Sequence, residues 1–295
     1  MNFYTGSDLA CESKAEDARV PGTVLNRRRI GSFRVCELQI RTREASRELG
    51  KPVGDYVTLE CGRIDRLGDD QQQLLARILA GELRGMAGRL SGKHPDGDFS
   101  VLAVGLGNAE LTADAIGPKT VGRLTATRHL RRHEQALYRS IGCSSLSALA
   151  PGVMGQTGIE VLELLRGVVG HVKPDTVIVV DALAARSCTR LASTVQISDT
   201  GIEPGSGVGN HRSPITARTL GVPVIAVGVP TVVNSATLVY DALQEAGMDP
   251  GNPSLRRVLE TGRSFFVSPK ESDVITDQVA GVLSRAISSA FTADW

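Results

Sequence analysis

The order of apolar and polar residues along the chain predicts strands from about residue 33 onward. The first 30 residues or so are polar and show no clear period. Short apolar or alternating runs predict strands, and they lie at residues 33–40, 56–61, 99–104, 147–150, 176–181, 195–197 and 222–227. The run at 176–181 is almost wholly β-branched and apolar, which is typical of a strand buried on both faces.

Helical spacing of apolar residues predicts helices between and after these strands. They are expected at residues 71–90, 118–130, 157–169, 234–247 and 271–290. Thr157 and Glu160 have the spacing of a capping box at the start of the third helix, and Gly247 is expected to end the fourth. Strands and helices that alternate in this way predict an α/β fold, with a parallel or mixed sheet and helices on both faces.

The composition narrows the class of protein. The 295 residues allow one large domain or two modest ones. A hydrophobic share of 41% with 22% charged residues excludes a disordered chain. The formal net charge of +1 argues against a general nucleic-acid binder and against a polybasic membrane protein. Glycine is abundant, at 32 residues, whereas aromatic residues make up 4%; this combination suits an α/β protein with many strand-to-helix turns.

The cysteines and the N-terminal sequence give no sign of secretion or of a membrane anchor. Five cysteines are scattered without a C-x-x-C pair, so neither a disulfide framework nor a zinc site is expected. Residues 1–12 lack the basic and apolar regions of a signal peptide. The most apolar stretches are shorter than the ~20 residues that cross a bilayer. We therefore expect a cytoplasmic protein without membrane contact.

Two aspartates are the first candidates for chemistry. Ligands of an open α/β sheet bind at the carboxyl ends of its strands. Asp114 follows the strand predicted at 99–104, and Asp181 ends the strand predicted at 176–181. Two carboxylates from neighbouring strand ends can share one proton and activate water against a peptide carbonyl. Each also has a structural alternative, since a loop aspartate is often a helix N-cap or a salt-bridge partner.

Other polar motifs are weaker candidates. The glycine loop at 205–209 invites a phosphate-binding interpretation, but it lacks the Walker lysine and the full dinucleotide fingerprint. His129 and His133 are four residues apart, yet without a third ligand we expect a solvated pair rather than a metal site. No serine or cysteine stands in a G-x-S-x-G elbow, so a nucleophile of that kind is unsupported.

Several blocks between residues 100 and 235 resemble the germination protease (spore protease) family. They are GLGN at 105–108, DAIGP at 114–118, TRHL at 127–130, APGVMGQTG at 150–158, DALAARS at 181–187, QISDTGI at 196–202, PGSGVGN at 204–210 and GVPTVV at 228–233. Weaker matches lie at 50–52, 58–60 and 267–270. Because the blocks occur in order over a long stretch, the resemblance is specific.

The resemblance implies an endopeptidase that initiates the degradation of small acid-soluble spore proteins during spore germination. It also implies a three-layer α/β/α sandwich with a mixed, mainly parallel twisted sheet, similar to that of hydrogenase maturation proteases. The two proposed catalytic aspartates of the family correspond by motif to Asp114 and Asp181. Family likeness further implies a homotetramer in the forespore or spore core, with no cofactor and no direct nucleic-acid contact.

The family is made as a zymogen that removes its own N-terminal segment by cutting after an acidic residue. The sequence SDLA at 7–10 resembles that site. It implies cleavage between Asp8 and Leu9, a propeptide of residues 1–8 and a single α/β peptidase domain over residues 9–295. The alternative is an ordinary polar N-terminus without processing.

The hypothesis for the mechanism is general acid–base proteolysis. One aspartate of the pair, ionised, takes a proton from water, while the other, protonated, polarises the scissile carbonyl. Backbone N–H groups of Gly105, Gly107 and Asn108 are candidate oxyanion donors. One alternative is a metal-dependent, maturation-type peptidase, since the related hydrogenase maturation proteases bind a metal with similar acidic positions. A less favoured alternative is a non-enzymatic nucleotide-binding module built on residues 205–209.

Three residues depart from the pattern usual in the family. Ala109 and Ala113 stand where tryptophan and proline are usual, and Ser7 stands where threonine precedes the cut. The aspartate pair is intact, whereas the substrate preference and the tightness of zymogen control are left open.

Overall fold

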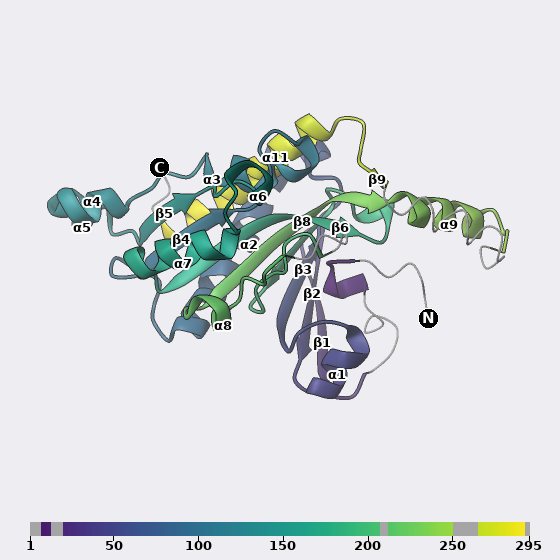
Figure 1. The fold of residues 1–295 in the computed structure, drawn as a ribbon, viewed down its shortest axis with the longest axis horizontal. Coiled ribbons are helices and arrows are strands. Elements are labelled where there is room, and N and C mark those ends of the chain that lie inside the picture. Colours follow the sequence, from purple (N-terminus) through teal and green to yellow (C-terminus); the bar gives the residue numbers. More distant parts are fainter. Residues whose placement is uncertain (1–6, 13–19, 207–211, 250–264, 293–295) are drawn as a thin grey trace.

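The computed structural model describes residues 7–12, 20–206, 212–249 and 265–292. Nine strands in these ranges form one sheet, in the order β1-β2-β3-β7-β8-β6-β4-β5, with β9 paired to β8 (Figure 1). The strands are β1 (Thr23–Ile30), β2 (Phe33–Ile40), β3 (Gly54–Glu60), β4 (Ser100–Gly105), β5 (Ser145–Leu149), β6 (Thr176–Ala185), β7 (Thr194–Ser198), β8 (Val224–Asn234) and β9 (Phe266–Val267).

The sheet is mixed, as the sequence predicted. Strands β5, β4, β6 and β8 run parallel to one another. The pairings β1–β2, β2–β3, β3–β7, β7–β8 and β8–β9 are antiparallel. The expectation of a mainly parallel sheet therefore holds only for these four strands, because β1 and β2 form a hairpin and β3, β7 and β9 also pair antiparallel with their neighbours.

Helices cover both faces of the sheet. The α-helices are α1 (Arg43–Leu49), α2 (Asp69–Ser91), α3 (Ile116–Val121), α4 (Arg128–His133), α5 (Gln135–Ile141), α6 (Met154–Thr157), α7 (Val161–Val172), α8 (Ala217–Leu220), α9 (Ser235–Glu245) and α11 (Ser272–Phe291). Short 3-10 turns are η1 (Ala10–Glu12), η3 (Ile64–Arg66), η4 (Thr112–Asp114) and η5 (Cys188–Arg190).

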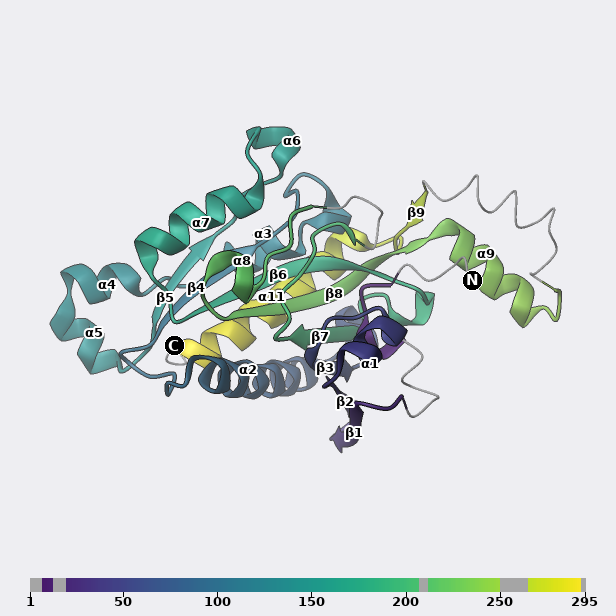
Figure 2. The same cartoon turned by 60° about the horizontal axis from the view of Figure 1, so that its bottom comes forward.

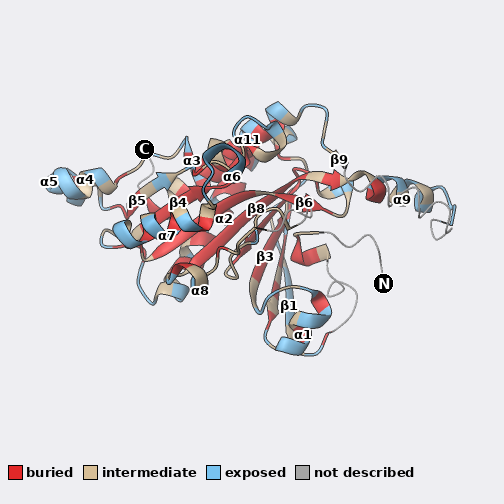
Figure 3. Cartoon of the chain, in the orientation of Figure 1, coloured by how far each residue is buried: buried red, intermediate tan, exposed pale blue. Residues whose placement is uncertain are grey.

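Two apolar cores lie on opposite faces of the sheet. Alternate residues of β6 face opposite sides, so that Ile178 and Val180 belong to the larger core, with α2 and α11, while Val177 and Val179 belong to the smaller core. Helices α2 and α11 lie side by side over the larger core (Figure 2). Helices α7 and α8 cover the smaller core, and the central strands are the most deeply buried elements (Figure 3). The rest of that second face, beyond α7 and α8, holds the candidate site.

Most elements predicted from periodicity are present. The predicted strands all match strands of the sheet, although β6 and β8 extend to Ala185 and Asn234, beyond the predicted 181 and 227. Helices α2, α9 and α11 match the predictions at 71–90, 234–247 and 271–290. Gly247 stops α9 as expected, with φ at 70°.

Two predicted helices are wrong in extent, and, apart from the two-residue β9, one strand has no counterpart among the predictions. The helix predicted at 118–130 is split, because Thr127 donates from its backbone N–H and its hydroxyl to carbonyls at the start of β5. The helix predicted from Thr157 begins at Val161, and Thr157 instead ends α6. The unpredicted strand is β1, whose residues are half-buried or exposed and therefore carry no core pattern.

Candidate active site

The fold brings Asp114 and Asp181 together. Asp114 is the last residue of η4, which follows β4 and precedes α3. Asp181 lies on β6, the strand next to β4 in the sheet. The approach depends on Gly117, since a Cβ there would lie 2.2 Å from the Leu106 carbonyl oxygen and 2.6 Å from that of Val180. The absence of a side chain thus lets the start of α3 pack directly against β6, one residue before Asp181.

Asp181 is buried inside its strand and does not stand at the end of it as predicted. Strand β6 continues through Ala185 because the small and apolar residues that follow Asp181 keep pairing with β8. The residue is 6% exposed, and its carboxyl group accepts a hydrogen bond from the backbone N–H of Ala182 at 2.9 Å. Burial raises the pKa of Asp181 well above its usual value, and the nearby charges of Asp114 and Asp8 raise it further.

The loop after β4 wraps around Asp114. The backbone N–H of Asn108 donates to Asp114 Oδ2 at 2.7 Å, and the N–H of Leu106 donates to the Val180 carbonyl at 2.8 Å. Gly107 has φ at 109° and lies against the backbone of Asp114, where a side chain would not fit. Burial raises the pKa of Asp114, while the bond from Asn108 opposes this rise. Asp114 caps no helix, because the N-cap of α3 is Ala115.

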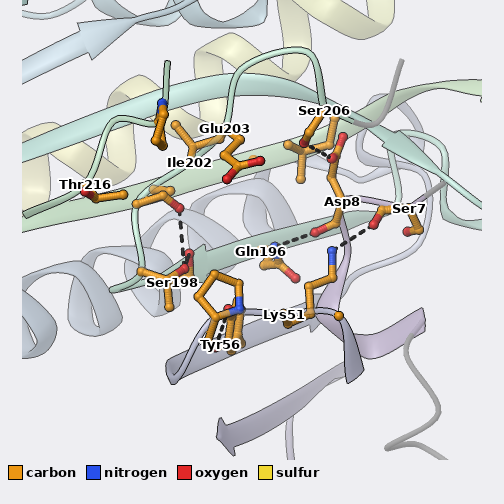
Figure 4. A pocket seen from close by; sticks show the side chains of 18 of the residues that line it. Ser7, Asp8, Lys51, Tyr56, Gln196, Ser198, Ile202, Glu203, Ser206 and Thr216 are labelled. Atoms are coloured by element: carbon orange, nitrogen blue, oxygen red, sulfur yellow. Dashed lines mark hydrogen bonds between the residues drawn. The ribbon is translucent and has the colours of Figure 1, made fainter. Parts of the chain in front are cut away.

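Ser7 and Asp8, at the start of a short N-terminal segment that runs from Ser7 to Glu12, line a cleft on the same face of the sheet as Asp181. The cleft has a volume of about 610 Å³, and Figure 4 shows Asp8 between Gln196 and Ser206. The backbone N–H of Asp8 donates to the Ala184 carbonyl at 3.0 Å, and Asp8 Oδ2 accepts from the Ala184 N–H at 2.9 Å. The segment therefore runs beside the end of β6, three residues from Asp181.

Further contacts hold this segment on both sides of Asp8. Lys51 Nζ donates to the carbonyl of Ser7 at 2.8 Å, and Ser206 Oγ donates to Asp8 Oδ1 at 3.0 Å. Burial lowers the pKa of Lys51, although the charges of Asp8 and Glu12 oppose the change. Leu9 is fully buried in an apolar cluster that includes Leu183, Leu191 and Val233.

Glu12 anchors the far end of the segment. Its carboxylate accepts hydrogen bonds from the backbone N–H groups of Arg186 at 2.8 Å and Ser187 at 3.0 Å. The Arg190 guanidinium lies 3.6 Å away. Charged acceptors make the stronger class of hydrogen bonds, so Glu12 fixes the segment firmly beyond Leu9.

The sequence did not single out the residues that hold this segment. Gln196 lies on β7 in an otherwise apolar run, Lys51 follows α1, and Arg190 ends η5. The signals in the sequence were the polarity of Gln196 within a buried strand, where an unpaired amide would be costly, and the family-like blocks that include Gln196 and Lys51.

The weaker candidates stay outside the aspartate pair. In the glycine loop, Gly205 and Ser206 belong to the described chain, and Ser206 lines the cleft, whereas residues 207–210 lie outside the described residues. His129 and His133 are exposed on α4, as expected for a solvated pair. Over the described ranges, no group of three or more His, Cys, Asp or Glu side chains is placed to hold a metal ion. Over the same ranges, no helix is long and apolar enough to cross a membrane.

Known proteins resemble this chain along most of its length. A family model described as germination protease matches residues 5–246. The germination protease of Caldanaerobacter subterraneus subsp. tengcongensis is 37% identical over 308 residues, which cover 96% of this chain and 93% of the relative. The germination protease of Oceanobacillus iheyensis is 42% identical over 340 residues, covering 96% and 91%. That of Priestia megaterium is 40% identical over 268 residues, covering 88% and 71%.

Proposed function

The chain belongs to the germination protease family, and on that basis we propose that it is a self-processing endopeptidase that cleaves small acid-soluble spore proteins by means of Asp114 and Asp181. Family membership supports a peptidase of spore germination. The substrate, the zymogen step and the aspartate mechanism are the parts that we add to it.

One observation carries the proposal. The aspartate pair, in which Asp181 is buried and Asp114 half-buried, and the segment with the expected cut site come together where the charges of Asp114 and Asp8 both raise the pKa of Asp181. A carboxyl group kept protonated by burial and like charges can act as an acid at neutral pH. Two carboxyl groups in unequal environments are the arrangement that acid–base hydrolysis of a peptide requires.

We assign the two carboxyl groups different roles. Asp181, with the more strongly raised pKa, is the protonated member that donates to the scissile carbonyl. Asp114 is the ionised member, since the N–H of Asn108 stabilises its charge, and it takes a proton from the attacking water. The water oxygen bonds to the carbonyl carbon as the carbonyl oxygen takes the proton of Asp181. The C–N bond then breaks, Asp114 passes the proton that it took from water to the departing amine, and a hydroxyl proton of the intermediate returns to Asp181.

The N-terminal segment is the first substrate of this site in our account. Its acidic residue Asp8 precedes the buried Leu9, and both are held by contacts to β6 and its neighbours. Cleavage between them releases residues 1–8 and removes Asp8 from the cleft. A spore protein then enters the same cleft with an acidic residue in place of Asp8.

Other properties follow from the family likeness. We propose a homotetramer located in the forespore or spore core, and a sheet architecture related to that of hydrogenase maturation proteases. The metal-dependent alternative gains no support from the described residues, whose acidic and histidine side chains form no ligand cluster.

Substitution of the pair tests the proposal. Asp114→Asn and Asp181→Asn each keep the size of the side chain and remove the titratable group. We expect each to reduce cleavage of a purified small acid-soluble spore protein by at least ~10⁴-fold, as loss of an essential acid or base does, with folding retained by circular dichroism. Near-normal turnover in either variant would refute the catalytic role of the aspartate pair.

A further inference from the structure

Gln196 contacts both sides of the expected cut. Its Nε2 donates to the carbonyl oxygen of Asp8 at 3.2 Å (Figure 4). Its Oε1 accepts from the backbone N–H of Ala10 at 2.6 Å. The Asp8 carbonyl is the one that hydrolysis between Asp8 and Leu9 would attack. One side-chain amide therefore binds the reacting carbonyl and fixes the chain beyond it.

The sheet places Gln196 in register with Asp181. Asp181 on β6 pairs with Gly228 on β8, and Gly228 pairs with Gln196 on β7. Paired residues on adjacent strands project to the same face, and neighbouring strands lie ~4.8 Å apart. Asp181 and Gln196 thus lie on the same face of the sheet, on two strands separated by β8, where the Leu183 side chain covers Gly228.

On the Asp114 side of the site, fewer backbone N–H groups are available as oxyanion donors. The N–H of Asn108 is engaged by Asp114 and that of Leu106 by Val180. Gln196 is 7% exposed, and both polar atoms of its amide bond to the N-terminal segment. A buried amide fixed in this way costs little reorganisation when negative charge develops on the oxygen that it binds.

We propose that Gln196 is a catalytic residue of this site, which donates its Nε2–H to the carbonyl oxygen as that oxygen becomes an oxyanion. The role rests on the proposed function. It applies to self-cleavage at Asp8 and equally to a substrate held in the same position. Through Oε1 the same side chain holds the N–H two residues beyond the cut, which fixes the backbone on the far side of the scissile bond.

Two variants separate the donor from the acceptor. Gln196→Glu keeps an acceptor for the Ala10 N–H and, when ionised, loses the donor. Gln196→Met removes both at similar volume. The matched control is Gln72→Met, because Gln72 is a buried glutamine of α2 that hydrogen-bonds to Leu67, Gln278 and Arg285, remote from the cleft.

The experiment uses the full chain and three readouts. Mass spectrometry follows the rate at which the N-terminus at Leu9 appears, hydrogen exchange at the Ala184 amide reports whether Asp8 stays bound, and thermal unfolding reports folding. We expect both Gln196 variants to process ~10²–10³-fold more slowly, as removal of one oxyanion donor does. In Gln196→Glu, Ala184 should stay protected, and the rate should recover as the pH falls, because a protonated carboxyl group can donate. Gln72→Met should process at the wild-type rate.

The contrary outcomes are distinct. Processing within threefold of the wild-type rate in the Gln196 variants, with Asp181→Asn inactive, would refute the role of Gln196 and leave the aspartate pair in place. Slow processing with Ala184 unprotected in both variants would show that Gln196 only docks the segment, which also refutes the oxyanion role. A wild-type chain that cleaves neither itself nor a spore protein would overturn the proposed function, and the inference with it.

Discussion

The carboxyl group of Asp181 lies close enough to that of Asp114 for the charge of Asp114 to raise its pKa. The two residues are 67 positions apart in the sequence, and they meet because α3 packs against β6 through Gly117. Burial of a carboxyl group beside a second one is unfavourable for folding unless a proton is bound. The pair is therefore a cost to stability at neutral pH.

This cost predicts that Asp181→Asn stabilises the protein at neutral pH. Because the pKa of Asp181 is raised in the folded state, the folded chain binds the proton more tightly, and stability falls as the pH rises through that pKa. Each unit of elevation is worth about 1.4 kcal/mol, or about 2 °C or more in Tm for a chain of this size. Thermal unfolding between pH 3 and pH 8 should show a gain for the variant that disappears below about pH 4, where the carboxyl group is protonated in both states. An equal gain at every pH would contradict the elevated pKa.

Gly117→Ala is expected to destabilise the site severely. The new Cβ would lie within 2.6 Å of backbone atoms of Leu106 and Val180, so the backbone has to shift, at a cost of about 2 kcal/mol or more. Gly170→Ala in α7 is the matched control, because nothing lies within 4 Å of its Cβ. That change should stabilise the helix by about 1 kcal/mol. Urea unfolding measures both variants, and equal stabilities would refute the close packing of α3 on β6.

Glu12→Gln is expected to loosen the N-terminal segment. The carboxylate binds two backbone N–H groups and lies beside Arg190, and hydrogen bonds to a charged group are worth about 1.5–3 kcal/mol. Hydrogen exchange at Arg186 and Ser187 should accelerate about tenfold or more. Asp98→Asn, an exposed change beside Arg131, should leave exchange at these amides unchanged. Unaltered protection in Glu12→Gln would mean that the segment does not depend on this anchor.

Chelators are expected to leave the peptidase activity unchanged. Along the described chain no cluster of ligating side chains is present, and one oxygen of Asp114 already accepts from Asn108. Turnover of a spore protein before and after prolonged dialysis against EDTA measures the effect. Loss of activity that a divalent ion restores would instead favour the maturation-type metal peptidase.

The central strands of the sheet could be predicted because their residue types indicate that they are buried. The apolar, β-branched residues from Thr176 onward belong to a strand buried on both faces, and no other common element fits them. The exposed strand β1 could not be predicted in the same way, since Arg27, Arg28 and Arg29 are all charged and give no alternation of apolar and polar residues. Its position depends on pairing with β2, which is a contact between segments rather than a property of either one.

The candidate site likewise contains residues that the sequence predicted and a residue that it did not predict. Asp114 and Asp181 were predicted because each carboxylate follows or interrupts an apolar run, and both resemble family motifs. Gln196 was not predicted, because its position depends on the register of three strands and on a segment nearly 190 residues away that donates to it and accepts from it. A local sequence pattern can identify a charged residue within a buried strand. It cannot show which backbone atoms of a distant segment will form hydrogen bonds with a side chain of that strand.

Self-cleavage is the most direct test of the central claim, that Asp114 and Asp181 hydrolyse a peptide bond held in this cleft. Intact-mass and N-terminal mass spectrometry of the purified chain, before and after incubation, measures it in the wild type and in Asp181→Asn. We predict a new N-terminus at Leu9 in the wild type and none in the variant. A wild-type chain that stays intact, or a variant that is cut at Leu9 at the same rate, would contradict the account.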